Sequence, residues 1–365
     1  MTYKDDLHKK LHADLKALLR TMPSFLLEFF RGLGDSKSPT TKLNYAYDLR
    51  GFFEYLAAET ELGSKSLTKV LDEENLQNSQ LKLFSLEDLK KVTIDHIEGY
   101  LDYVTVYEKT LNPGSEKTIT RTNKARGKAR KLAALRTMFN YFIKKEKLIS
   151  NPARIVDSPK ITNKPITYLE IDEAAKLLDI VEGGDKLTDR QRSFHDKTKE
   201  RDLAICTLLL GTGIRVSECV GIDLHHVNFD THAILVTRKG GSQEIVYFGE
   251  EVAEALSTYL EKRKKIIPLE THENALFLSL QNRRITERAI QNLVKKYAKT
   301  VTLKNISPHK LRSTYGTQLY RATGDIYLVA AALGHKDINT TQAHYASMDD
   351  ERRRTAAQVV KLRKE

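Results

Sequence analysis

Hydrophobic side chains in residues 1–160 recur at the spacing of one helical face. Ser38 followed by Pro39 marks a helix start, because serine can cap free backbone N–H groups and proline suits the first turn. Thr93 can cap a second helix. With the apolar run MPSFLLEFF, these stripes predict a small helical bundle. The stripes are Tyr45, Leu49, Phe52, Phe53 and Leu56; Ile97, Leu101 and Val104; and Leu132, Leu135, Phe139, Phe142 and Ile143.

The hydrophobic pattern changes at residues 151–167, a segment that has three prolines and few large apolar side chains. Proline restricts helix there, so this segment is the predicted linker between two domains, residues 1–160 and 161–365. A second polar stretch, at 182–200, is predicted to be a surface loop of the second domain. The linker prolines are Pro152, Pro159 and Pro165.

The second domain combines helical and strand patterns. The run RDLAICTLLLGTGIRVSECVGI predicts an apolar helix broken at Gly211 and Gly213, followed by a short helix that starts near Val216. The run THAILVTRKGGSQEIVYF alternates on both sides of Gly240 and Gly241, which indicates a β-hairpin. The predicted fold is therefore mainly α with a small β-sheet: a helical bundle followed by a mixed α/β domain.

Composition narrows the choice of partner. The 365 residues are too many for one ordinary core, and the net charge of +12 favours a polyanion as the partner, although a solvated lysine surface is the alternative.

Cys206 and Cys219 have apolar neighbours and indicate small core residues in a reducing compartment. The charged N-terminus lacks a signal-peptide core, and no window approaches the roughly 18 apolar residues of a spanning helix. A cytoplasmic protein that does not bind membranes is expected.

Residues 117–136 carry eight cations and no carboxylate. This segment is predicted to begin in a loop and to continue onto a helix. Because unrelieved like charge costs stability unless an external anion offsets it, nucleic-acid contact is favoured over a solvated face. Phosphate contacts of this kind position a protein without specifying sequence.

Arg215 and Lys239 occupy two junctions of the second domain. Arg215 precedes the short helix, where free N–H groups can hold an anion. An ion pair with Glu218 in the first turn explains this arginine equally well. Lys239 lies at the hairpin turn and can extend outward, although most turn lysines are only solvated.

A further group of polar residues follows near the C-terminus. The motif SPHKLR opens another helix and places His309 and Arg312, three residues apart, on one face. A later helix stops at Gly334 and leaves His335 just past its end, and Tyr345 follows in LGHKDINTTQAHYASM. The combined set has two guanidiniums, an ammonium, two imidazoles and a phenol, without a carboxylate or a metal-ligand cluster. Such a set suits an anionic transition state, and phosphoryl transfer fits best.

These residues resemble the tyrosine recombinases. The motifs TGIRVSE, TRKGG, HKLR and LGH and a late tyrosine occur in the family's order, and the resemblance covers most of the chain. It is strongest to the single Xer recombinases of streptococci and lactococci, which act on a chromosomal dif-type site. One position departs from many Xer proteins: the ninth residue after His335 is His344, and Tyr345 is the tenth. A spacing of ten occurs among transposon integrases of the family, and Tyr345 is the predicted nucleophile.

The resemblance implies a two-domain DNA clamp, with a SAM-like core-binding domain before the catalytic domain and its C-terminal helix. Tyr345 would attack a scissile phosphate, Arg215 and Arg312 would hold its oxygens, and His335 would donate a hydrogen bond. His309 would take the tyrosine proton, and Lys239 would protonate the leaving 5′-oxygen. The predicted DNA-contacting residues are Thr41, Lys42, Lys124, Arg126, Lys128, Arg130 and Arg136.

The partners implied are double-stranded DNA with paired inverted half-sites and a homotetramer on two duplexes. Neither a cofactor nor a metal is implied, and the absence of a G-x-x-x-x-G-K-[ST] loop agrees with a reaction that needs no ATP.

The leading function is chromosome dimer resolution at a dif-type site. The alternatives are an integrase of a phage or transposon and a catalytically inactive DNA-binding protein. The last segment, with Ala356, Val359 and Val360 on one stripe, is either a helix that docks on a neighbouring subunit or a self-packed terminus.

Overall fold

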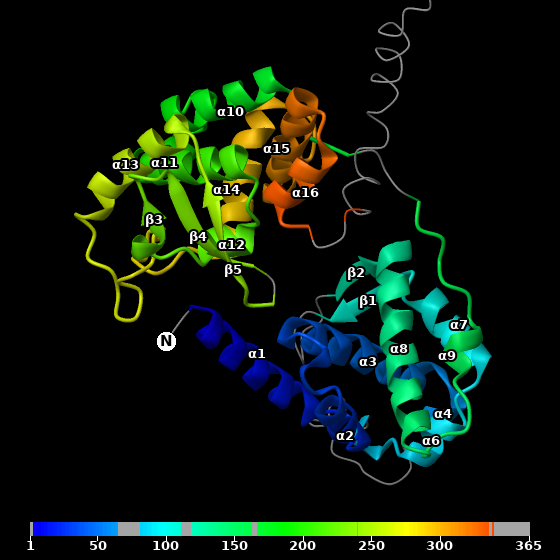
Figure 1. The fold of residues 1–365 in the computed structure, drawn as a ribbon. Helices are drawn as coiled ribbons and strands as arrows, with labels where there is room; N and C mark the ends of the chain where they lie inside the picture. Colours follow the sequence, from blue (N-terminus) through cyan, green and yellow to red (C-terminus); the bar gives the residue numbers. More distant parts are fainter. Residues whose placement is uncertain are drawn as a thin grey trace, which may run out of the picture. The chain divides into compact units, whose positions relative to one another are not determined.

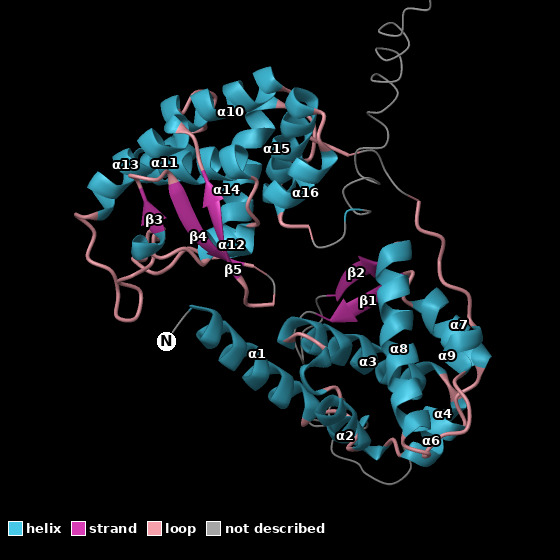
Figure 2. Cartoon of the chain, viewed as in Figure 1, coloured by secondary structure: helices cyan, strands magenta, loops and turns pink. Residues whose placement is uncertain are grey.

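The computed structural model describes residues 3–64, 81–110, 118–162, 166–238, 240–335 and 338. The chain divides into two compact units, residues 1–163 and 164–365 (Figure 1). The described parts are mostly helical, with one small sheet in each unit (Figure 2). This confirms the predicted class, mainly α with little β.

The first unit is built around helix α3. This helix contacts α1, α4, α7 and α8, and the aromatic and aliphatic stripes predicted for α3, α7 and α8 lie in one core. The described helices are α1 (Tyr3–Leu19), α2 (Phe25–Gly32), α3 (Pro39–Glu59), α4 (Glu61–Ser64), α6 (Leu86–Lys90), α7 (Ile94–Tyr103), α8 (Ala125–Lys144) and α9 (Pro152–Ile155), with short 3-10 turns η1 (Gly34–Ser36) and η3 (Leu81–Leu83).

Both predicted helix starts in this unit are confirmed. The Ser38 hydroxyl accepts a hydrogen bond from the backbone N–H of Thr41, and Pro39 is the first residue of α3. Thr93 caps α7, and the His96 ring accepts the Thr93 backbone N–H in return. These reciprocal bonds satisfy N–H groups that a helix start leaves without partners.

Two expectations for this unit need correction. The basic segment does not begin in a loop, because strand β2 (Thr118–Thr122) pairs antiparallel with β1 (Val106–Thr110) before α8 starts. The first linker proline opens α9, which packs on α7 and α8, and Ala153 and Val156 are buried in the core of the unit. The segment from Pro152 to Val156 therefore belongs to the first unit and not to a linker.

The second unit is built around helix α11, which contacts α10, α12, α13, α14 and α15. A three-stranded antiparallel sheet, ordered β3-β4-β5, lies beside the helices (Figure 2). The elements are α10 (Ile171–Gly183), α11 (Asp189–Thr212), α12 (Val216–Val220), η4 (Leu224–His226), β3 (Val227–Asn228), β4 (Ala233–Thr237), β5 (Gln243–Tyr247), α13 (Glu250–Arg263), α14 (Glu287–Val301), α15 (Pro308–Thr323) and α16 (Ile326–Leu333).

The hairpin and the helix break of this unit are confirmed. Strands β4 and β5 pair from Ala233–Tyr247 to Thr237–Gln243, which leaves the predicted turn between them. Helix α11 ends where Gly213 adopts a left-handed φ of 62°, and α12 starts at Val216. Gly211 does not break the helix and lies inside it. Cys206 and Cys219 are fully buried, and burial raises the pKa of both thiols.

The surface loop predicted at 182–200 is wrong. Most of it forms the end of α10 and the first half of α11, whose start is fixed by a capping box between Thr188 and Gln191. This half of α11 is anchored by His195, which is 2% exposed. The His195 Nδ1 lies 3.0 Å from the Tyr297 hydroxyl, which donates to the Asp202 carboxylate at 3.0 Å. This polar stretch is thus anchored to α14 through the buried His195, while most of its other residues are exposed.

We expect the stability of this unit to depend on the charge of His195. Burial lowers the pKa of His195 below 6.5, and the charge of Lys296 lowers it further. Between the lowered folded pKa and the unfolded value, only the unfolded chain is protonated, so the free energy of unfolding falls as the pH drops through this window. The stabilising contribution is complete above pH 6.5. Denaturant unfolding between about pH 7.5 and 5.5 measures this loss.

The matched variant is His195→Gln, which does not titrate and can still bond the Tyr297 hydroxyl. It should be less stable at the upper pH and should show a flatter dependence on pH. An unchanged pH dependence would assign the acid sensitivity to other groups.

Candidate active site

Arg215 lies at the joint between α11 and α12 and is engaged from two sides. Its backbone N–H and its Nη1 each donate to the Glu218 carboxylate at 2.8 Å, and its Nη2 donates to the Gly334 carbonyl at 3.3 Å. The Glu218 side chain is 2% exposed, whereas that of Arg215 is 34% exposed. The ion-pair alternative is therefore present, and the guanidinium still reaches solvent.

Arg312, on the first turns of α15, is 3% exposed. Its Nη1 donates to the Gly213 carbonyl at 2.6 Å, and its Nη2 donates to the Leu333 carbonyl. Both carbonyls are at the C-terminal ends of helices, where backbone acceptors lack intrahelical partners and a cation is favoured. Arg312 therefore ties the end of α11 to the end of α16.

His335 is positioned by the end of α16. Asp325 caps the start of this helix, accepting the backbone N–H groups of Tyr327 and Leu328. Gly334 ends it with a left-handed φ of 58°, and the His335 N–H donates to the Ala330 carbonyl at 2.9 Å. The predicted stop of this helix and the position of His335 just beyond it are confirmed, and His335 is half-buried.

The structure brings three of the predicted residues to one place. Arg215 and Arg312 donate to Gly334 and Leu333 carbonyls, and His335 is the next residue along the chain. His309 lies one turn before Arg312 on α15 and is exposed. Two predicted residues, Lys239 and Tyr345, lie outside the described residues, as does the C-terminal stripe.

Two carboxylates, Glu218 and Glu244, lie among these cations, and only Glu218 is a partner that the sequence predicts. Arg238, the residue before the turn lysine, donates to Glu218 at 2.9 Å and to Glu244 at 2.8 Å. Burial lowers the pKa of Arg238, but bonds with Glu244 and Glu218 outweigh burial and leave this pKa raised. The Arg238 hydrogen bond lowers the pKa of Glu244, and the charges of Arg215 and Arg312 lower it further. Arg238 and Glu244 are therefore both ionised at neutral pH.

This arrangement can receive an anion. Guanidiniums bind non-bridging phosphate oxygens through paired, fixed donors, and the backbone carbonyls that hold Arg312 do not neutralise its charge. Charge that gathers on a phosphate in a transition state would be stabilised by donors that are already oriented.

Gly334 is constrained by this packing as well as by its backbone. A Cβ at this position would lie 2.8 Å from the Arg238 Cζ, closer than real contacts allow. We expect Gly334→Ala to lower the melting temperature, because left-handed strain costs about 1–2 kcal/mol and the guanidinium must also move. The DNA strand cleavage that the sequence resemblance implies should slow, because Arg238 and the His335 turn shift together.

The matched control is Gly34→Ala. Gly34 also has a positive φ, 46°, but nothing lies within 4 Å of its Cβ position. Gly34→Ala should be destabilised only by the backbone strain and should cleave DNA at the wild-type rate. Equal effects of the two variants on cleavage would show that the contact with Arg238 is unimportant.

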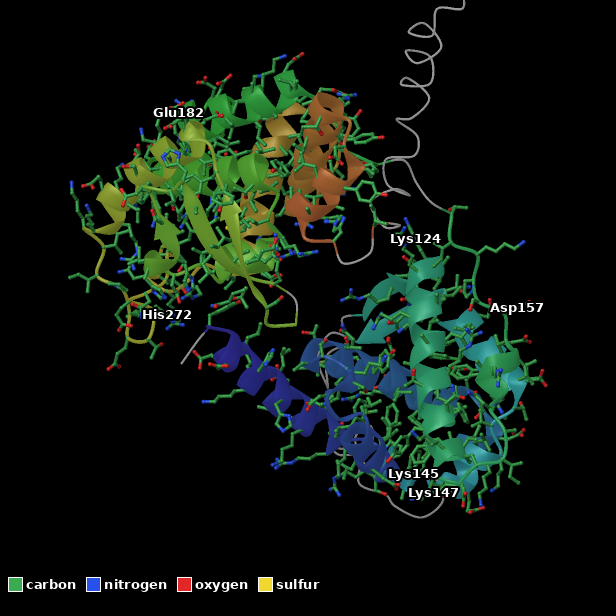
Figure 3. The ribbon with its side chains drawn as sticks, in the orientation of Figure 1. Lys124, Lys145, Lys147, Asp157, Glu182 and His272 are labelled. Carbon is green, nitrogen blue, oxygen red and sulfur yellow. The ribbon has the colours of Figure 1, made fainter. Side chains whose placement is uncertain are left out.

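The candidate DNA-contacting residues of the first unit fall into two groups. Lys124 and Arg126 are exposed at the start of α8, where Lys124 is seen in Figure 3, and Thr41 and Lys42 are partly exposed on the first turn of α3. The others have partners within the unit. Lys128 donates to Thr105, Arg130 pairs with Asp48 at 2.5 Å, and Arg136 donates to the Ala153 and Val156 carbonyls.

Asp223, His225 and His226 place ligand-type atoms within 4.8 Å of one another, a grouping that sequence reasoning missed. The His226 Nδ1 accepts the Asp223 backbone N–H at 3.1 Å, and the Asp223 carboxylate pairs with Arg284. A neutral imidazole that accepts at Nδ1 carries its proton on Nε2, so a metal would have to break an existing bond. The grouping carries no metal assignment.

Comparisons with known proteins define the class. The profile of the phage integrase family matches residues 167–352. The chain is 35% identical to tyrosine recombinase XerC of Caldanaerobacter subterraneus subsp. tengcongensis, over 92% of this chain and 86% of the relative. It is 30% identical to tyrosine recombinase XerS of Streptococcus agalactiae, over 92% of this chain and 95% of the relative. The chain therefore belongs to the phage integrase family, the tyrosine recombinases.

Within this family it is a site-specific DNA recombinase of the Xer type, an enzyme class that acts by transesterification through a tyrosine. A crystal structure of XerH bound to a palindromic difH substrate, in a post-cleavage complex, has a similar fold. The TM-score is 0.58 at 19% identity, with 84% of this chain and 75% of that chain covered. This likeness confirms the predicted recombinase fold. In the described residues, every helix is too short or too polar to cross a membrane.

Proposed function

We propose that this protein cuts and rejoins double-stranded DNA at a dif-type site and thereby resolves chromosome dimers. The observation that carries the proposal is the meeting of Arg215 and Arg312 at the C-terminal end of α16, directly before His335. The Xer-type relatives support the DNA substrate. Because this substrate is the chromosome, the proposed location is the cytoplasm.

In the proposed reaction the Tyr345 hydroxyl attacks a scissile phosphate. A bond from the tyrosine oxygen to phosphorus forms as the bond to the 5′-oxygen breaks, which gives a 3′-phosphotyrosine and a free 5′-hydroxyl. That hydroxyl of one strand then attacks the phosphotyrosine of the partner strand and releases Tyr345. Each broken phosphodiester is stored as another ester, so the reaction needs no ATP.

Each remaining residue has one step in this scheme. Arg215 and Arg312 hold the non-bridging oxygens and stabilise the charge that gathers on them, and His335 donates a further hydrogen bond. His309 takes the tyrosine proton, and Lys239 protonates the leaving 5′-oxygen. A phenol has an ordinary pKa near 10 and is a poor nucleophile, so a base and neighbouring cations are needed.

The proposed assembly is a homotetramer that joins two duplexes. Each protomer binds half of a palindromic site, with the first unit and the catalytic unit both in contact with the DNA. The exposed cations at the start of α8 support the first of these contacts, because Lys124 and Arg126 point away from the core. Phosphate contacts made there would set the register of the protein on the duplex.

A second candidate is integration or excision of a mobile element. The observation that favours it is the spacing of ten residues between His335 and Tyr345, which resembles transposon integrases. The chemistry is the same in both candidates, and only the target differs.

Plasmids with two directly repeated target sites test both candidates. Incubation of the purified protein with a plasmid that carries two dif-type palindromes should give two smaller circles. Joined transposon ends, tested on a second plasmid, should stay unrecombined. The reverse result would assign the protein to a mobile element, and failure on both plasmids would contradict recombination at either class of site.

A further inference from the structure

Arg238 directly follows β4, at the start of the turn that leads to β5, and its side chain contacts the active-site groups. It is 5% exposed although it is charged. Its backbone N–H donates to the Ser242 carbonyl at 2.8 Å, and its own carbonyl accepts the Gly241 N–H at 3.0 Å. These two bonds close the turn that carries residue 239.

The Arg238 side chain shares a carboxylate with Arg215. Its Nη1 donates to Glu218 Oε2 at 2.9 Å, the same oxygen that accepts the Arg215 backbone N–H. The other Glu218 oxygen, Oε1, accepts the Arg215 Nη1 at 2.8 Å. A carboxylate as buried as Glu218 is held in one orientation only when its lone pairs are satisfied. Arg238 therefore holds the Glu218 carboxylate in place, and this carboxylate in turn orients Arg215.

The opposite edge of the Arg238 guanidinium binds Glu244 through a fork. Nε donates to Oε2 at 2.8 Å, and Nη2 donates to Oε1 at 3.1 Å. Glu244 is 43% exposed and lies close enough to Arg215 and Arg312 for their charges to act on it. Among the described residues, Arg215 and Arg312 are other cations whose charges act on the Glu244 carboxylate, so without Arg238 it would be drawn toward them.

Arg238 also contacts the turn that carries His335. The space where a Gly334 Cβ would lie is filled by the Arg238 guanidinium, with Cζ and Nε both 2.8 Å away. The Gly334 carbonyl accepts a hydrogen bond from Arg215. Arg238 and Arg215 are thus packed around one glycine.

We propose that Arg238 is a positioning residue for DNA cleavage: it fixes the Glu218 carboxylate that orients Arg215, keeps the Glu244 carboxylate away from the phosphate-binding donors, and supports the Gly334–His335 turn. The inference rests on the proposed function, because it takes Arg215 and His335 to be groups that act on the scissile phosphate. Lysine cannot replace this residue fully, since one ammonium lacks the planar fork that binds two carboxylates along different edges.

Single-turnover cleavage of a nicked dif-type duplex, at saturating protein, measures this role. Arg238→Met should cleave roughly 10- to 100-fold more slowly, because small misplacements of catalytic groups have effects of this size. Its affinity for the same DNA should be unchanged. Arg238→Lys should fall between Arg238→Met and the wild type. Adding Glu244→Gln to Arg238→Met should restore part of the rate, because the double variant lacks the carboxylate that would occupy Arg215 and Arg312.

The matched control is Arg263→Met. Arg263 is also 5% exposed, and its guanidinium donates to the carbonyls of Glu273 and Ala275 away from these groups. Arg263→Met should lower the melting temperature and leave the cleavage rate at the wild-type value, measured well below that temperature.

Three results would overturn the role of Arg238. The first is wild-type cleavage by folded Arg238→Met, the second is an equal slowing by Arg263→Met, and the third is no recovery in the double variant. Failure of the proposed function is distinct from all three, because the wild-type protein itself would then form no covalent complex with the nicked duplex.

Discussion

Tyr345→Phe should form no covalent complex with a nicked substrate and should not recombine DNA. The phenyl ring has no oxygen with which to form a phosphate ester, so the loss should exceed about a thousandfold, as for other nucleophile deletions. Binding of the same duplex should remain, because the cationic groups of Arg215 and Arg312 and the first unit are unchanged. Gel separation of covalent from non-covalent complexes measures both quantities on one sample.

Tyr327→Phe is the control for this experiment. Tyr327 is 73% exposed on α16, and it precedes His335 in the chain. It should retain wild-type cleavage. If Tyr327→Phe lost the covalent complex and Tyr345→Phe kept it, the nucleophile would be Tyr327, and the role of Tyr345 would be contradicted.

Substitution of Arg312 should have the second largest effect. Arg312→Lys keeps the charge but has one ammonium, which cannot reach the Gly213 and Leu333 carbonyls and a phosphate together. We expect cleavage to slow by about 10²- to 10³-fold, as for removal of one preorganised donor to a transition-state anion. A carbonyl left without its partner should also reduce the free energy of unfolding by about 1–3 kcal/mol.

Arg321→Lys separates these effects from a general loss of arginine on α15. Arg321 is on the same helix and pairs with Glu170 at 2.6 Å near the surface. Its variant should cleave normally and melt close to the wild type. Arg312→Lys would contradict the phosphate role if its cleavage rate stayed normal while its stability fell.

Local chemistry in the sequence predicts many parts of this fold. The caps at Ser38 and Thr93 need only backbone N–H groups within three residues, and the hairpin around Gly240 needs only a turn between two alternating runs. The start of α11 was missed for the opposite reason. His195 looks like part of a polar loop until Tyr297, about one hundred residues later, supplies its buried partner.

The active site, too, can be predicted from the sequence only in part. The motifs locate Arg215, Arg312 and His335 because these residues are next to helix ends that the sequence marks. Their convergence on the carbonyls that end α16 depends on tertiary packing. The contact between Arg238 and Gly334 is also a tertiary feature, since it needs a glycine of one element to leave space for a guanidinium of another. Adjacent polar residues in a sequence do not reveal such a contact.

Peptide mapping of the trapped protein–DNA complex tests transesterification by Tyr345 most directly. The complex would be formed on a nicked dif-type duplex with a metal chelator present, digested, and analysed by mass spectrometry. The expected result is a nucleotide 3′-phosphate joined to the peptide that contains Tyr345, in the same yield with and without chelator. DNA joined to any other side chain, or a complex that forms only when divalent metal is supplied, would contradict the mechanism.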